Sequence, residues 1–206
     1  MCPLTRHHGQ GSAHDTRARA AVRNRPGPPD AVRYSPRVTT RQKDSHCSYC
    51  GTEFASGAGW PRTCAACGGI TYRNPLPVAV ALLPVRTAEG TGLLLVRRAI
   101  EPRRGLLALP GGFVDLGETW QEAVVRELDE ETGIKAAAGE VRLADALSGD
   151  TGHLLVFGLL PERAAEDLPP AVVTDETDGR ELLLAPAELA FPLHTEAVRN
   201  WFDGRY

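Results

Sequence analysis

The segment from Gly112 to Ile134 constrains the fold more than any other part of the 206-residue chain, because it defines a helix at both ends. Thr119-Trp-Gln-Glu122 has the pattern of a capping box, in which the threonine and glutamate side chains bond each other's backbone amides. Gly133 follows the last expected turn and can adopt the left-handed conformation that ends many helices. The sequence therefore predicts a helix from Thr119 to about Glu131.

One face of this helix carries apolar residues in its first half and acids in its second. At 3.6 residues per turn, positions 120, 123, 124, 127, 128 and 131 form a single stripe. The apolar half of the stripe is Trp120, Ala123 and Val124. The second half is Glu127, Leu128 and Glu131, with Glu130 beside it. Carboxylates therefore occupy positions where a core-facing stripe continues.

The placement of these acids is unfavourable without a cation. Glu127 and Glu131 are like charges one turn apart, which repel each other by a few tenths of a kcal/mol. Glu130 and Glu131 lie in the last turn, where the helix dipole disfavours anions. Oxygen ligands favour Mg²⁺ or Mn²⁺ over zinc. The pattern therefore favours a divalent metal site, although a solvated acidic helix face is the alternative.

Four of the five cysteines form two pairs, Cys47-Ser-Tyr-Cys50 and Cys64-Ala-Ala-Cys67, with 13 residues between them. Each pair is followed by glycine, which permits a tight turn around the sulfur atoms. Four thiolates can complete the tetrahedral shell of a zinc ion, so the spacing predicts a structural zinc ribbon over residues 45–72. Two disulfides or two redox pairs are the alternatives. A reducing compartment disfavours the disulfides, and neither pair lies in the βαβ context of a redox motif.

After residue 72 the pattern changes to short apolar runs of strand length separated by turn signals. The expected strands are Pro77–Pro84, Gly92–Arg97, Leu106–Leu109, His153–Leu160 and Glu181–Leu184. A second helix is expected near Thr195 to Phe202. Strands on both sides of a central helix predict an α/β domain over residues 73–206.

The N-terminal residues 1–44 differ from the rest of the chain in charge. They carry nine Lys or Arg residues against three Asp, whereas the complete chain has a net charge of −3. The segment has few large apolar residues and contains the cluster Arg25-Pro-Gly-Pro-Pro29. Such a composition predicts a disordered basic tail, with a nucleic-acid-binding arm as the less favoured interpretation.

The residues from Gly112 to Ile134 resemble the Nudix box, G-x5-E-x7-R-E-U-x-E-E-x-G-U with U aliphatic, at every fixed position. The resemblance implies a Nudix hydrolase with an α/β/α sandwich and a mixed sheet, which splits a nucleoside diphosphate linked to another group. It also implies that Glu127 and Glu131, often with Glu130, hold Mg²⁺ or Mn²⁺. Arg126 would be tied to Glu118 and orient the acids.

Two further roles follow from the same resemblance. Gly111 and Gly112 would let the chain turn tightly, so that nearby amides can approach the substrate phosphates. The general base differs among family members and lies on either the box or a later loop. The loop Thr174–Glu181 offers four acids, of which we favour Glu176, and a solvated acidic turn is the alternative for each of them.

The ribbon placed before a Nudix domain is similar to the NADH pyrophosphatase group. The signature S-Q-P-W-P-F-P of that group is absent after the box, where the chain has Lys135–Ala144. We therefore expect a small-molecule nucleotide substrate such as NADH, ADP-ribose or a nucleotide sugar, without choosing among them. A Nudix-fold sensor that binds a nucleotide without turnover is the alternative.

The expected partners and location follow from composition. No apolar run approaches the roughly 20 residues of a membrane span, and the first residues lack the apolar segment of a signal peptide. We therefore expect a cytoplasmic protein with no membrane partner. A nucleic-acid partner is disfavoured, because Arg62 is the single basic residue between Cys47 and Cys67. A homodimer is left open.

Overall fold

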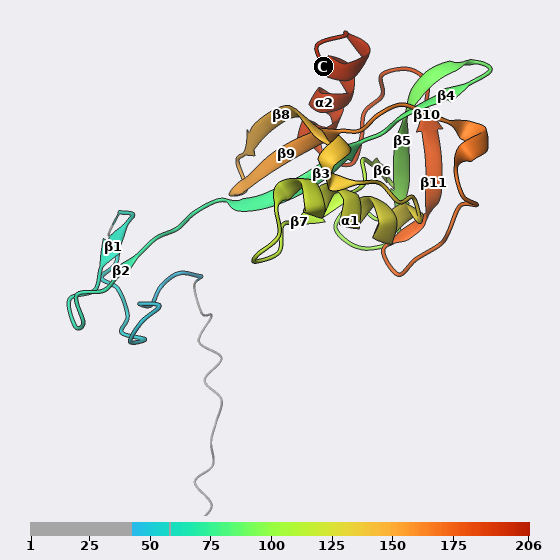
Figure 1. Ribbon diagram of the computed structural model, residues 1–206. Helices are drawn as coiled ribbons and strands as arrows, with labels where there is room; N and C mark the ends of the chain where they lie inside the picture. Colours follow the sequence, from blue (N-terminus) through green and yellow to red (C-terminus); the bar gives the residue numbers. More distant parts are fainter. Residues whose placement is uncertain (1–42, 58) are drawn as a thin grey trace, which may run out of the picture. The chain divides into compact units, whose positions relative to one another are not determined.

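The computed structural model describes residues 43–57 and 59–206 (Figure 1). All but the last two positions of the expected basic tail lie outside the described residues. Neither α-helix of the described part has the length and apolar character that a membrane span requires.

The cysteine-rich segment forms a small module around two turns. Its two short strands, β1 (Arg62–Thr63) and β2 (Ile70–Thr71), pair antiparallel. Gly51 and Gly68 follow the two cysteine pairs with φ angles of 73° and 72°. This left-handed conformation is readily available to glycine, which explains why glycine closes both turns.

The rest of the described chain contains two sheets. The first has the order β7-β3-β9-β8 and consists of β3 (Leu76–Leu82), β7 (Gly111–Phe113), β8 (Arg142–Gly149) and β9 (His153–Leu159). The second has the order β10-β4-β5-β11, with β6 also paired to β5. Its strands are β4 (Pro84–Thr87), β5 (Gly90–Arg98), β6 (Leu107–Ala108), β10 (Arg163–Ala164) and β11 (Thr177–Leu183).

Both sheets are mixed, because β3 pairs parallel with β9, β4 pairs parallel with β10, and the other pairs are antiparallel. The single strand expected over Pro77–Pro84 is wrong. The chain leaves the first sheet after Leu82 and enters the second at Pro84. The apolar run continues through this crossing because Leu83 is itself fully buried.

Two α-helices, α1 (Trp120–Thr132) and α2 (Pro192–Phe202), pack against the sheets (Figure 1). Alternate residues of β3 belong to two separate cores. Ala79 and Ala81 join the core that contains α1, whereas Val80 and Leu82 join the core that contains α2. This alternation follows from the two-residue period of a strand and produces an α/β/α arrangement.

Two short 3₁₀ turns, Ala138–Glu140 and Ala165–Asp167, complete the described elements. The expected start of the second helix at Thr195 is wrong by three residues, since α2 begins at Pro192. Proline suits the first helical position because its missing N–H would have no partner there.

Candidate functional site

The helix α1 begins and ends where the sequence predicts, to within one residue. Thr119 caps it with both bonds of the capping box: its amide donates to Glu122 Oε2 at 2.7 Å, and the Glu122 amide donates to Thr119 Oγ1 at 3.3 Å. Gly133, with φ of 72°, ends the helix and donates to the Asp129 carbonyl. The two ends fix which face of the helix meets the sheet.

The acidic stripe is buried as its register requires. Glu127 and Glu131 are only 8% and 6% exposed, although both carry ionisable side chains. The Gly111 amide on β7 donates to Glu131 Oε2 at 3.1 Å. A Cβ atom on Gly112 would lie 2.3 Å from Glu127 Oε1, so the glycine provides the space that this carboxylate occupies. Strand β7 therefore forms one wall of the site.

Arg126 connects the acids of the box to one another. Its Nε and Nη2 donate to the two carboxylate oxygens of Glu118 at 3.2 and 2.7 Å, which is a two-pronged contact. Its Nη1 donates to Glu127 Oε1 at 2.7 Å and to Glu130 Oε2 at 3.1 Å. Its Nη2 also donates to the Phe113 carbonyl on β7. One guanidinium thus orients three carboxylates and joins the helix to the strand.

The pKa values of the two buried acids are raised, whereas the pKa of Glu118 is lowered. Burial raises the pKa of Glu131 to about 8, and the nearby charges of Glu127 and Glu176 add to the effect. Burial also raises the pKa of Glu127, against the opposing effect of Arg126. Hydrogen bonds from Arg126 chiefly lower the pKa of Glu118. The two buried acids therefore carry an electrostatic cost that the box arginine offsets only in part.

This donor set fits a hard divalent cation. A cation between Glu127 and Glu131 would offset both their desolvation and their mutual repulsion, and carboxylate oxygens are the ligands that Mg²⁺ prefers. Glu130 differs from these two acids, because its side chain is 60% exposed and contacts Arg126. The structure therefore brings Glu127 and Glu131 together at β7 and places Glu130 at the rim.

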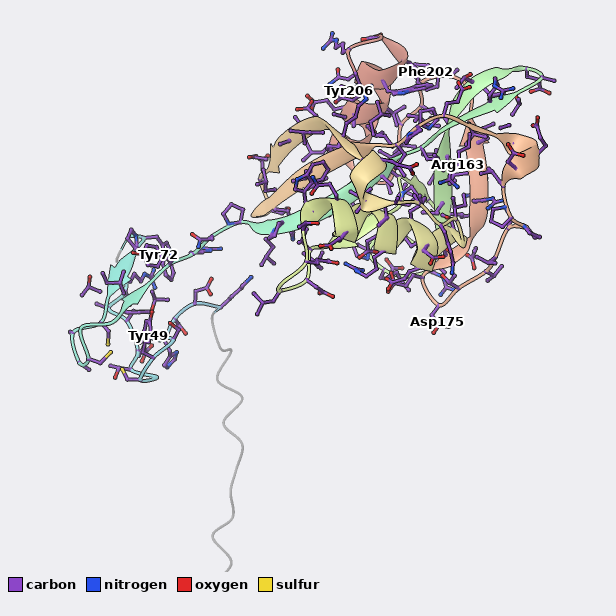
Figure 2. The ribbon with its side chains drawn as sticks, in the orientation of Figure 1. Tyr49, Tyr72, Arg163, Asp175, Phe202 and Tyr206 are labelled. Carbon is purple, nitrogen blue, oxygen red and sulfur yellow. The ribbon has the colours of Figure 1, made fainter. Side chains whose placement is uncertain are left out.

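Glu176 lies in the loop that precedes β11. Its backbone carbonyl accepts from the Ala99 amide at 2.7 Å, which attaches it to the end of β5. Its side chain is exposed, and it lies close enough to raise the pKa values of Glu127 and Glu131. Asp175, the preceding acid, points outward at the tip of this loop (Figure 2). The loop ends at Thr177, the first residue of β11, which is buried and which the sequence did not single out.

The four cysteines of the ribbon converge on one point. Their Sγ atoms all lie within 4.8 Å of one another, and Figure 2 shows sulfur atoms together near Tyr49. The distances Cys47–Cys67 and Cys50–Cys64 are 3.7 and 3.6 Å, far beyond a disulfide bond of about 2.05 Å. All four are free thiols, which contradicts the disulfide alternative.

Both cysteine turns are closed by the same backbone hydrogen bond, from the Gly51 amide to the Cys47 carbonyl and from the Gly68 amide to the Cys64 carbonyl. The Tyr49 amide points at Cys47 Sγ and the Gly69 amide points at Cys67 Sγ, each at 3.4 Å. An N–H group aimed at sulfur favours the thiolate, so each turn supplies one such donor to the cluster. Within the described residues, these cysteines are the one group of three or more metal-ligating side chains gathered this closely.

Comparison with known protein families matches residues 75–203 to the NUDIX domain. The chain belongs to the Nudix family. The match covers both sheets and both helices described above. The Nudix box itself runs from β7 through α1 to Gly133 and Ile134.

Individual relatives cover different parts of the chain. An ADP-ribose pyrophosphatase from Methanocaldococcus jannaschii is 60% identical over 63 residues, 31% of this chain and 37% of that protein. A NAD-capped RNA hydrolase NudC from Deinococcus radiodurans is 30% identical over 136 residues, 65% of this chain and 47% of that protein. The chain thus spans less than half the length of these two curated relatives.

Among solved structures, a NUDIX hydrolase from Nitrosomonas europaea superposes with a TM-score of 0.56 at 25% identity. The superposition covers 78% of this chain and 92% of that protein. The agreement confirms the Nudix fold expected from the sequence.

Proposed function

We propose that this Nudix protein is a metal-dependent hydrolase that cleaves the diphosphate linkage of a nucleoside diphosphate derivative. Water attacks one phosphorus atom, the bridging P–O bond breaks, and two phosphate monoesters leave. The observation that carries the proposal is the burial of Glu127 and Glu131 side by side against β7. Burying two like charges costs free energy, and a catalytic cation bound between them would offset that cost.

Glu127 and Glu131 would hold Mg²⁺ or Mn²⁺, with Glu130 as a further ligand from the rim. Bound there, the cation would neutralise phosphate oxygens and make the phosphorus accessible to attack. Arg126 fixes the Glu127 carboxylate and, through Glu118, the start of the box. The arginine therefore acts on the reaction by orienting the acids rather than by touching substrate.

Glu176 is our candidate general base. A base must reach the attacking water from a fixed backbone. The Glu176 carbonyl accepts from the amide of Ala99, directly after β5, while the residue itself is exposed. Gly112 remains our candidate for close approach of substrate phosphates, as the Nudix resemblance implies, and its missing Cβ also leaves the space that the Glu127 carboxylate occupies. The Gly111 amide is already bonded to Glu131, so it supports the metal ligand instead of the substrate.

We further propose that the four cysteines hold one structural Zn²⁺. Four sulfur ligands leave no open coordination position, which is the mark of a structural site. A cytoplasmic location is consistent with this assignment, since thiols stay reduced there.

The relatives narrow the substrates to test first. Their names refer to ADP-ribose and to NAD-capped RNA, both of which contain an adenosine diphosphate linked to a second ribose. We propose substrates of this type, and the experiment is a panel of ADP-ribose, NADH, NAD-capped RNA, nucleotide sugars and nucleoside triphosphates with Mg²⁺ or Mn²⁺. Release of AMP from an adenosine diphosphate derivative, abolished by Glu127→Gln, would support the proposal. Wild-type activity in Glu127→Gln would refute the proposal, and so would the absence of turnover of every substrate in the panel.

A further inference from the structure

Thr174, in the loop before β11, and Thr177, the first residue of β11, are hydrogen-bonded to each other beside the site. Thr177 is only 1% exposed. A buried hydroxyl group costs free energy unless its hydrogen bonds are satisfied, and a valine of the same shape would avoid that cost. The hydroxyl groups therefore need an explanation in terms of what they bind.

The direction of each hydrogen bond follows from counting protons. Thr177 Oγ1 donates to the Glu131 carbonyl at 3.0 Å, which uses its single proton. Thr174 Oγ1 lies 3.1 Å from Thr177 Oγ1 and must therefore be the donor between them. Thr174 Oγ1 in turn accepts from the amides of Glu176 and Thr177 at 3.2 and 3.1 Å. We call this chain of bonds the threonine clasp.

The clasp ends on the helix that carries the buried acids. The last four carbonyls of a helix have no partner within it, and the Glu131 carbonyl is one of these. Thr177 satisfies it from β11, and Arg180 on the same strand donates to the Thr132 carbonyl at 3.4 Å. Thr177 thus caps the C-terminal end of α1 at Glu131, the residue whose carboxylate lies in the site.

The other end of the clasp fixes Glu176. The Glu176 amide donates to Thr174 Oγ1, and the Glu176 carbonyl accepts from the amide of Ala99, the residue after β5. Its backbone is therefore held on both sides. Its side chain makes no hydrogen bond or ion pair with any residue of the described chain. A carboxylate that is free at its tip and fixed at its base can reach into the site without reorganising the loop.

We propose that Thr177 is a positioning residue, which holds Glu176 at a fixed place relative to Glu131 through the threonine clasp. The inference rests on the proposed hydrolase function and on Glu176 as its base. On this proposal, the position of Glu176 depends on the Thr177 hydroxyl group and not on the total negative charge of the loop.

Kinetics of a double-mutant cycle test the inference on the substrate that the panel identifies. Thr177→Val keeps shape and burial but removes the hydroxyl, and we expect kcat to fall at least tenfold with KM nearly unchanged. Thr177→Ser keeps the hydroxyl and should restore most of the activity. In the Glu176→Gln background, Thr177→Val should cost nothing more, because it acts only through that carboxylate. Additive losses, or a normal kcat in Thr177→Val, would overturn the proposal.

Amide hydrogen exchange supplies a measurement that does not depend on turnover. Release of the clasp should speed exchange of the Ala99 amide, whose acceptor is the Glu176 carbonyl. Thr195→Val is the matched control, since Thr195 is also buried and bonds the Leu189 amide within the α2 region. The control should leave Ala99 exchange unchanged.

If the Ala99 amide exchanges in Thr177→Val at the same rate as in the wild type, the positioning role is refuted, even where the wild type is an active hydrolase. Absence of turnover in the wild type would refute the proposed function instead, and the exchange result would still show whether Thr177 holds the loop.

Discussion

Replacing Glu131 by glutamine should stabilise the protein when no Mg²⁺ or Mn²⁺ is present. The carboxylate is 6% exposed, and its pKa is raised from 4.5 to about 8. The folded state therefore binds the carboxyl proton of Glu131 more tightly than the unfolded state does. For this reason the contribution of Glu131 to the free energy of unfolding is most favourable below pH 4.5. It becomes steadily less favourable as the pH rises to about 8.

The magnitude follows from the same two pKa values. At pH 7 the unfolded carboxyl is ionised, whereas the folded one is held largely protonated, which costs about 3 kcal/mol of stability. At pH 5 the same difference shrinks to about 1 kcal/mol. Glu131→Gln keeps the shape and an acceptor for the Gly111 amide but does not titrate. We therefore expect the variant to exceed the wild type by about 3 kcal/mol at pH 7 and about 1 kcal/mol at pH 5.

The assay is urea unfolding of zinc-loaded protein dialysed free of Mg²⁺ and Mn²⁺, at both pH values. The difference in the free energy of unfolding between variant and wild type is taken at each pH, so that the contributions of the other titrating groups cancel. Mg²⁺ at one thousand times Kd should reverse the order at both pH values, because only the wild type gains binding free energy, about 4.1 kcal/mol at that concentration. Glu122→Gln is the control, since this exposed residue serves the helix cap and should lose a little stability under all conditions.

Two results would refute the reasoning. One is a variant less stable than the wild type at pH 7 without metal, which would mean that the carboxylate is stabilised by contacts we have not recognised. The other is a difference that does not change between pH 7 and pH 5, which would mean that Glu131 titrates normally.

Three other predictions concern residues outside the metal ligands. In Gly112→Ala the new Cβ would displace the Glu127 carboxylate, so the affinity for Mn²⁺, measured by calorimetry, should fall at least tenfold while stability is retained. In Gly111→Ala the new Cβ would instead clash with the Ala79 carbonyl, so this variant should have a lower urea midpoint. His194 is buried with its pKa lowered to about 3, so the wild type should lose about 2 kcal/mol between pH 7 and pH 5 that His194→Gln does not lose. Elemental analysis should find about one zinc per chain, and none in Cys64→Ser; a zinc content unchanged by that substitution would contradict the ribbon assignment.

The parts of the fold with strong local signals were predictable from the sequence. The helix α1 has a capping box at one end and glycine at the other, and both operate as expected. Its acidic stripe predicted the burial of Glu127 and Glu131 because helical periodicity alone places them toward the sheet. The cysteine spacing likewise predicted four converging sulfur atoms.

The missed features depend on tertiary contacts. Strand β8 (Arg142–Gly149) is an edge strand with polar and apolar residues on partly exposed faces, so it has no clean alternation. The crossing between sheets at Leu83 leaves no mark in a continuous apolar run. Thr177 stands in a polar, acidic segment, where nothing in the sequence distinguishes a buried threonine from a solvated one. Its partner, the Glu131 carbonyl, lies 46 positions away.

The parallel pairing of β3 with β9 determines the order in which the chain can fold during synthesis. Leu76 pairs with His153 and Leu82 with Leu159, so the first sheet cannot close until 77 further residues have been made. The helix α1 packs on β9 at Gly158, where a methyl group would lie 2.9 Å from Val124. The cysteine module needs only contacts complete by Thr71 and can form first. A nascent chain can therefore carry a finished ribbon before β9 is made, whereas the core between α1 and the first sheet is completed only when Gly158 of β9 packs on Val124.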